Sequence, residues 1–168
     1  MLTIGIDPGL TGAAVLTNAS GQILECGDLP TCTRPAGGGK VTNWLDVRAL
    51  ATMLRDWSAR HEFAAHAVCV VIEQPRPMPS MPSTTSASLF DTVGAIRGVV
   101  AALNAGAVLH ADPQAWKRTF GLKAGDKNAA RECAQRLFPS SAATFKRAKD
   151  HNRAEAALLA HWGRMEVA

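Results

Sequence analysis

The sequence predicts an α/β protein built on a five-stranded mixed sheet, with three antiparallel strands followed by two parallel ones and helices on its flanks. Near the N-terminus, three short segments that alternate apolar and polar residues are separated by tight turns, as in an antiparallel meander. Two later β-branched segments each follow a helical stretch, and such crossovers predict strands parallel to the first. With 168 residues, we expect one domain over residues 1–168.

The first three strands are recognised by their period-two alternation and by the turns between them. In the first, LTIGID, apolar residues alternate with small or polar ones until Pro8 and Gly9 end the strand in a turn. The glycine-rich stretch 30–42 has no apolar period, so we expect a flexible loop there. The three predicted strands span residues 2–7, 12–18 and 22–29.

Helices are predicted where apolar residues recur three and four positions apart, and the fourth strand where a β-branched run indicates burial on both faces. The prolines of 75–86 predict a loop rather than a helix. In order, the elements after residue 42 are a helix capped by Asn43 with its apolar face from Leu45 to Trp57, a strand over 65–74, the loop 75–86, a helix over 87–104, a strand over 107–111, short helices within 112–122 and 126–139, and a last helix starting near Asn152.

Composition excludes some classes of protein. Hydrophobic residues make up 47% of the chain, yet no apolar run approaches the roughly 20 residues that would cross a bilayer, so we expect no membrane association. The four cysteines form no CxxC pair, which favours reduced thiols over a zinc site or a disulfide framework. We therefore expect a cytoplasmic protein without a targeting segment.

Positive charge is concentrated toward the C-terminus. From Lys117 onward there are eleven Lys and Arg against five Asp and Glu, a local charge of +6. Residues 1–116 carry seven against nine, a local charge of −2, which together give the net +4. A basic segment of this kind indicates a polyanionic partner, most simply nucleic acid, although solvated helix faces would produce the same pattern.

Two predicted strands end on a carboxylate. Asp7 closes the first strand and Glu73 the fourth, and if these strands are parallel neighbours the two side chains emerge together. Adjacent carboxylates repel, and one of them takes up a proton unless a cation neutralises the pair. Oxygen-only ligands favour Mg²⁺ or Mn²⁺. The alternative for Asp7 is a structural role, capping the turn that follows it.

A third set of candidate ligands opens the last helix, in KDHNRAEAALLAHWG. It consists of Asp150, His151, Asn152 and Glu155. Asn152 and Glu155 share a helix face, and the same Asn-x-x-Glu spacing is that of a capping box, which is compatible with metal binding. Three or four acids gathered beside a basic segment fit hydrolysis of a phosphodiester with two metal ions.

Several of these segments together resemble the RuvC-type Holliday junction resolvases of the RNase H-like superfamily. The resemblance covers nearly the whole chain, and its end looks closest to phage and plastid relatives. It is carried by IGIDPGLTG, VVIEQP, GAIRGVVAALN, PQAWKRTFGL and RAEAALLA. It implies a bacterial or phage-encoded homodimer that binds branched DNA and nicks two strands of a four-way junction symmetrically, with two Mg²⁺ or Mn²⁺ ions per active site. The apolar helix over 87–104 would form the dimer contact.

The resemblance also assigns roles to residues. The metal ligands it implies are Asp7, Glu73 and acids of the last helix, of which Glu155 matches the family's terminal acid, with Lys117 and Lys127 near the scissile phosphate. The expected DNA contacts are Arg76, Lys117, Lys123, Lys127 and Arg153. Two positions depart from the family's pattern. Asn152 stands where the family usually has Asp or His, so Asp150 or His151 would take its place as a metal ligand, and we choose Asp150 because a carboxylate best restores the charge. Arg76 stands where the family often has an aromatic wedge, in a loop with Met78 and Met81.

Other functions fit part of the sequence. Asp7, Gly9 and Thr11 also match the phosphate signature of actin-like ATPases and sugar kinases, but those enclose a nucleotide between two such domains, so we expect no nucleotide cofactor. A non-catalytic junction-binding protein would gain nothing from acids that face DNA phosphates. An RNase H-like nuclease that cuts forks, flaps or hybrids remains an alternative substrate class.

Overall fold

The computed structural model describes residues 1–36, 38–76, 81–123 and 125–167. Five strands form the main sheet in the order β3-β2-β1-β6-β7, with β1 antiparallel to β2, β2 antiparallel to β3, and β6 parallel to both β1 and β7. This arrangement confirms the predicted mixed sheet. The strands are β1 (Leu2–Asp7), β2 (Ala13–Thr17), β3 (Ile23–Asp28), β6 (Val68–Glu73) and β7 (Ala107–Ala111).

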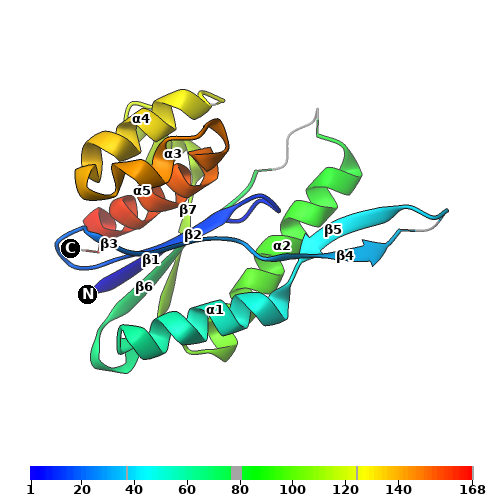
Figure 1. Cartoon of the computed structure of the whole chain (residues 1–168), viewed down its shortest axis with the longest axis horizontal. Helices are drawn as coiled ribbons and strands as arrows, with labels where there is room; N and C mark the ends of the chain where they lie inside the picture. Colours follow the sequence, from blue (N-terminus) through cyan, green and yellow to red (C-terminus); the bar gives the residue numbers. More distant parts are fainter. Residues whose placement is uncertain (37, 77–80, 124, 168) are drawn as a thin grey trace.

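Helices cover both faces of this sheet (Figure 1). Helices α1 (Val47–Arg60) and α2 (Ser83–Ala102) bury Leu50, Leu54 and Ile96 against one face. On the other face lie α3 (Pro113–Thr119), α4 (Lys127–Leu137) and α5 (His151–Glu166). Because side chains alternate along a strand, Ile4 and Ile6 enter the first core, which leaves Thr3, Gly5 and Asp7 on the α5 face.

Helix α5 packs very closely on β1. A Cβ atom on Gly5 would collide with the backbone of Ala156 and Ala160, and one on Gly163 would collide with Val71. Glycine at these two positions therefore permits the close approach. Since Gly5 lies beneath Ala156 and Thr3 lies near Gly163, α5 runs antiparallel to β1, and its first turns lie over the carboxyl ends of β1 and β6.

The prediction of a flexible loop over residues 30–42 is wrong. This stretch forms most of a β-hairpin, with β4 (Thr31–Pro35) antiparallel to β5 (Val41–Leu45). Both strands are largely exposed, so neither has the alternation of apolar and polar residues by which a half-buried strand is recognised in a sequence. Asn43 is accordingly a strand residue, and the cap of α1 is Asp46, whose carboxylate accepts from the Ala49 N–H at 2.9 Å.

Two other boundaries differ from the predictions. Helix α2 begins at Ser83, directly after Pro82, so part of the predicted loop 75–86 is helical; proline obstructs a helix interior but not its start. Three short 3₁₀ helices were not predicted: η1 (Phe63–Ala65), η2 (Pro139–Phe145) and η3 (Ala148–Asp150). Within the described ranges, no helix has the length and apolar character needed to span a membrane.

Candidate active site

The carboxyl ends of β1 and β6 carry two acids on the same face of the sheet. The strands pair in parallel with Ile6 opposite Ile72, so the next residues, Asp7 and Glu73, end neighbouring strands side by side. Both follow an isoleucine that points into the α1–α2 core, and both therefore face α5. The sheet register alone brings these two carboxylates to one edge.

Glu155 and Lys117 complete the group from two helices. Glu155 lies in the second turn of α5, next to Ala156, which contacts Gly5. Lys117 lies in α3, which begins directly after β7 because Asp112 caps its first turn. The Lys117 Nζ is 3.3 Å from Glu155 Oε1 and 3.9 Å from Glu73 Oε1. We refer to Asp7, Glu73 and Glu155 as the acidic cluster; the Lys117 ammonium lies among its carboxylates.

Trp116 is a member of this site that sequence reasoning missed. Its side chain is fully buried, and its Nε1–H donates to Glu73 Oε1 at 2.9 Å. The Lys117 Nζ lies 5.0 Å from the Trp116 ring centroid. A buried indole needs an acceptor for its N–H. The position of Trp116 next to Lys117, in PQAWKRTFGL, is the feature of the sequence that could have indicated its part in the site. Trp116 fixes the orientation of the Glu73 carboxylate.

The positive charge near the acidic cluster is too small to balance its three carboxylates. Burial, together with the negative charges of Glu155 and Glu73, raises the pKa of Asp7 to about 7, although the Gly9 N–H and Lys117 act in the opposite direction. Burial also raises the pKa of Glu73, against the opposing effects of Lys117 and Trp116. The Gly9 N–H lies 3.4 Å from Asp7 Oδ1, so the turn-capping role is present but weak. A single lysine does not neutralise three carboxylates.

The donor set of the cluster fits a hard divalent cation. Its ligands are all carboxylate oxygens, which Mg²⁺ and Mn²⁺ prefer, and a cation would relieve the repulsion that raises the Asp7 pKa. As the side chains lie, no three His, Cys, Asp or Glu residues of the described part are gathered closely enough to hold one ion. The ligand types of the cluster fit a metal ion, but in this conformation Glu73 and Glu155 are turned toward the Lys117 ammonium.

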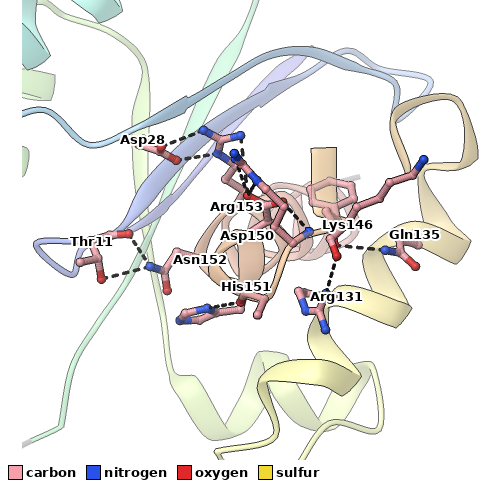
Figure 2. Close-up of polar contacts among 12 residues, drawn as sticks. Thr11, Asp28, Arg131, Gln135, Lys146, Asp150, His151, Asn152 and Arg153 are labelled. Carbon is pink, nitrogen blue, oxygen red and sulfur yellow. Dashed lines mark hydrogen bonds and ion pairs between the residues drawn. The ribbon is translucent and has the colours of Figure 1, made fainter. Parts of the chain in front are cut away.

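Asp150 lies at the start of α5 beside Asn152 and Arg153 (Figure 2), and its carboxylate is bound by Arg147 instead of taking the expected place with Asp7, Glu73 and Glu155. Its carboxylate, only 2% exposed, accepts from the Arg147 backbone N–H at 2.8 Å and from the Arg147 guanidinium at 2.8 Å. The Arg147 guanidinium holds the pKa of Asp150 below its ordinary range. Sequence spacing could not show this pairing, because the preceding 3₁₀ turn directs the side chain toward Arg147.

Asn152 and His151 take local roles. The Asn152 amide Nδ2 donates to the Thr11 backbone carbonyl and, at 3.1 Å, to the Thr11 hydroxyl, which ties α5 to the turn after β1 (Figure 2). The predicted capping box of Asn152 and Glu155 is wrong, since α5 begins at His151 and both residues lie within it. The His151 Nδ1 lies 3.1 Å from the Ala148 carbonyl and so donates to it.

The residues expected to contact DNA occupy different environments. Lys123 and Lys127 are exposed beside and at the start of α4. Arg76 forms an ion pair with Asp112. Arg153 binds both oxygens of Asp28, at 2.6 and 2.7 Å, and in this conformation its guanidinium serves a structural contact. Met78 lies outside the described residues.

Comparisons with known proteins show which fold this is. No family model matches the chain, and no curated protein shows significant sequence similarity. Among solved structures, Thermus thermophilus RuvC in complex with a Holliday junction substrate is 15% identical, with a TM-score of 0.60 over 98% of this chain and 96% of that one. A second Thermus thermophilus RuvC structure is 15% identical, with a TM-score of 0.50 over 99% and 97%. The chain therefore has the fold of the RuvC structures over its whole length.

Proposed function

We propose that this chain is a structure-selective endonuclease that resolves four-way DNA junctions by metal-dependent hydrolysis of phosphodiester bonds. The observation that carries the proposal is the convergence of Asp7, Glu73 and Glu155, from three separate elements, around the Lys117 ammonium. This cluster lies at the sheet edge of a fold shared with RuvC, for which one structure contains a Holliday junction substrate.

The acidic cluster would hold Mg²⁺ or Mn²⁺, with two ions per active site. When bound, such ions supply a water nucleophile and stabilise the departing oxygen. The chain's own residues prepare that chemistry: Trp116 holds one oxygen of Glu73 in place, and burial keeps Asp7 poorly hydrated. Lys117 would bind the scissile phosphate once cations neutralise the carboxylates that now surround its ammonium.

Contacts to the rest of the DNA would come from basic residues near the same edge. We propose that Lys123 and Lys127 bind phosphates beyond the cleaved one, and that Arg76 exchanges Asp112 for DNA when a junction is bound. Arg153 would have to release Asp28 to do the same. Each phosphate contact of this kind makes binding more sensitive to salt.

A homodimer is part of the proposal, and helix α2 supports it. Its outward side carries a stripe of small residues, one aromatic ring and one acid: Ala87, Phe90, Asp91, Gly94, Gly98 and Ala101 are all exposed. No atom would lie within 4 Å of a Cβ added at Gly94 or Gly98, so a second helix has room to approach. A two-fold contact along this α2 stripe would hold two active sites at a fixed separation.

The test is cleavage of a synthetic four-way junction, a fork and a plain duplex, each with Mg²⁺ and with Mn²⁺. We expect the junction to be cut into two nicked duplexes. The variants D7N, E73Q and E155Q should lose cleavage by at least about 100-fold while keeping junction binding, since each removes a charge rather than a DNA contact.

The remaining outcomes select other functions. Equal cutting of junction and duplex would indicate a general nuclease, and preference for the fork would indicate a different branched substrate. Junction binding without cutting in either metal would indicate a non-catalytic binding protein. Loss of both folding and binding in D7N would assign Asp7 to the turn rather than to the reaction.

A further inference from the structure

The β4–β5 hairpin extends beyond the sheet edge that carries the acidic cluster (Figure 1). Its base is fixed to the candidate active site: the Leu29 N–H, just before β4, donates to the Gly12 carbonyl at 2.8 Å, in the turn that follows Asp7. The Asp46 N–H closes the base by donating to the Pro30 carbonyl at 2.9 Å. Leu29 and Leu45 are buried in the main core, while most of the hairpin between them is exposed.

The chemistry of the hairpin suits a polyanion. Residues 31–45 include Arg34 and Lys40 and no Asp or Glu. The Arg34 guanidinium lies 4.8 Å from the centroid of the Trp44 ring on the facing strand, and the Trp44 Nε1–H donates to the Thr42 hydroxyl at 2.9 Å. A cation held on an aromatic face loses little conformational freedom on binding. Trp44 therefore holds Arg34 in place on the exposed part of the hairpin.

The dimensions of the hairpin match those of duplex DNA. Each strand has five residues, which corresponds to a length of about 17 Å, or roughly five base pairs. The major groove of B-form DNA is wide enough to admit a two-stranded β-ribbon. Nothing lies within 4 Å of a Cβ added at Gly38 or Gly39, so these two glycines stand clear of the rest of the described chain.

We propose that the β4–β5 hairpin is a second DNA-binding element, which grips a duplex arm adjacent to the cleaved strand. Arg34 and Lys40 bind backbone phosphates of that arm, and the ribbon lies in its major groove. The inference rests on the proposed action on branched DNA and adds to it a contact outside the acidic cluster. Because the hairpin base is bonded to the turn after Asp7, gripping the arm also sets the position of the cleaved strand.

The test measures junction binding in EDTA, where metal-dependent cleavage is prevented, over a range of salt concentrations. The variant R34A/K40A removes two phosphate contacts, so the slope of log affinity against log salt should fall by about 2 and the affinity by about tenfold or more at 0.1 M salt. The matched control R55A/R136A removes two exposed charges from α1 and α4 and should leave the slope unchanged.

Tryptophan fluorescence tests the contact directly. Trp57, Trp116 and Trp162 are buried, whereas Trp44 is partly exposed on the hairpin. We expect junction DNA to change the fluorescence of the wild-type protein and the change to be clearly smaller in W44F; the change that remains in W44F comes from Trp116, whose ring lies 5.0 Å from the Lys117 Nζ. All variants should match the wild type in circular dichroism, since every altered residue lies at the surface.

The outcomes separate this inference from the proposed function. If R34A/K40A binds with the wild-type slope while the wild type binds and cuts junctions, the hairpin inference is overturned and the proposed function stands. If the slope falls as expected but no metal supports cutting, the hairpin inference stands and the nuclease proposal fails. A wild-type protein that does not bind junctions overturns both.

Discussion

At Asp7, burial and the neighbouring carboxylates both oppose ionisation of the side chain. In the folded chain it is 9% exposed and faces Glu155 and Glu73, and its pKa rises to about 7. In the unfolded chain an aspartate titrates near 3.8. Between these two values the native state binds more protons than the unfolded state, so raising the pH lowers the free energy of unfolding. The acidic cluster therefore destabilises the metal-free protein at neutral pH.

This titration predicts the behaviour of D7N in EDTA. Wild-type protein should lose stability between about pH 4 and pH 7, by about 4 kcal/mol at most, since a tenfold change in proton affinity is worth about 1.4 kcal/mol. D7N cannot ionise at this position, so its advantage over the wild type should grow from pH 5 to pH 8 in urea unfolding. Mn²⁺ should stabilise the wild type and stabilise D7N much less. If the free energy of unfolding changed with pH in the same way in the wild type and D7N, the pH dependence could not come from Asp7.

Asp150 illustrates a limit of reading ligands from sequence spacing. The sequence predicts a run of polar residues at the start of the last helix, and that run is present, but which carboxylate joins the cluster depends on Arg147. Glu155 could be placed because it adjoins the alanines that pack on β1. The partner of Asp150 lies in an irregular turn, where no periodicity constrains the direction of a side chain.

A structural role for Asp150 predicts that D150N lowers stability more than activity. Loss of the ion pair between the buried Asp150 carboxylate and the half-exposed Arg147 guanidinium should reduce the free energy of unfolding by roughly 2 kcal/mol, while cleavage per folded molecule at low temperature stays near that of the wild type. N152A, which loses only the Thr11 contact, is the comparison. A stable but inactive D150N would return Asp150 to the list of metal ligands.

At the scale of elements, the strands and helices that bury a face could be predicted, and the exposed hairpin could not. Strand β1 alternates because one face meets α1 and α2 and the other meets α5. In contrast, β4 and β5 are stabilised by their mutual ladder and bury only Leu45, so burial left no pattern in their sequence. The start of α2 was misplaced for a similar reason, because its exposed first turn carries polar residues.

The close packing of α5 on β1 predicts that adding a single methyl group at Gly5 destabilises the protein. In G5A the new Cβ would collide with the backbone at Ala156 and Ala160, which must lift α5 from the sheet. We expect a loss of about 3 kcal/mol in urea unfolding and reduced cleavage, since Glu155 moves with the helix. The control is G27A, where the new Cβ would meet the flexible end of the Met53 side chain at 3.0 Å instead of backbone, so the loss should be clearly smaller. Equal effects of the two variants would show that α5 is not held at this contact.

At the scale of the whole molecule, the separation of two active sites matters as much as the chemistry of each. Under the proposed function, one acidic cluster would cut one strand, and a four-way junction is resolved only when two strands are cut at related positions. The α2 stripe offers the surface that would relate two copies, and it lies on the opposite face of the sheet from α5. A contact there leaves the acidic cluster of each copy open to DNA.

This arrangement predicts that the F90E variant still binds and nicks junction DNA but no longer makes paired cuts. Phe90 is 40% exposed and lies one turn from the N-terminal end of the stripe, and a charge at that position would be buried without a partner in a two-fold contact. We expect analytical ultracentrifugation to show a dimer for the wild type and a monomer for F90E, while the control T52E, an exposed charge on α1, stays dimeric. On a plasmid that extrudes a cruciform, the wild type should give linear product, whereas F90E should give nicked circles because its two cuts are independent. Linear product from a monomeric F90E, or a monomeric wild type that cuts in pairs, would show that paired cutting does not depend on the α2 stripe.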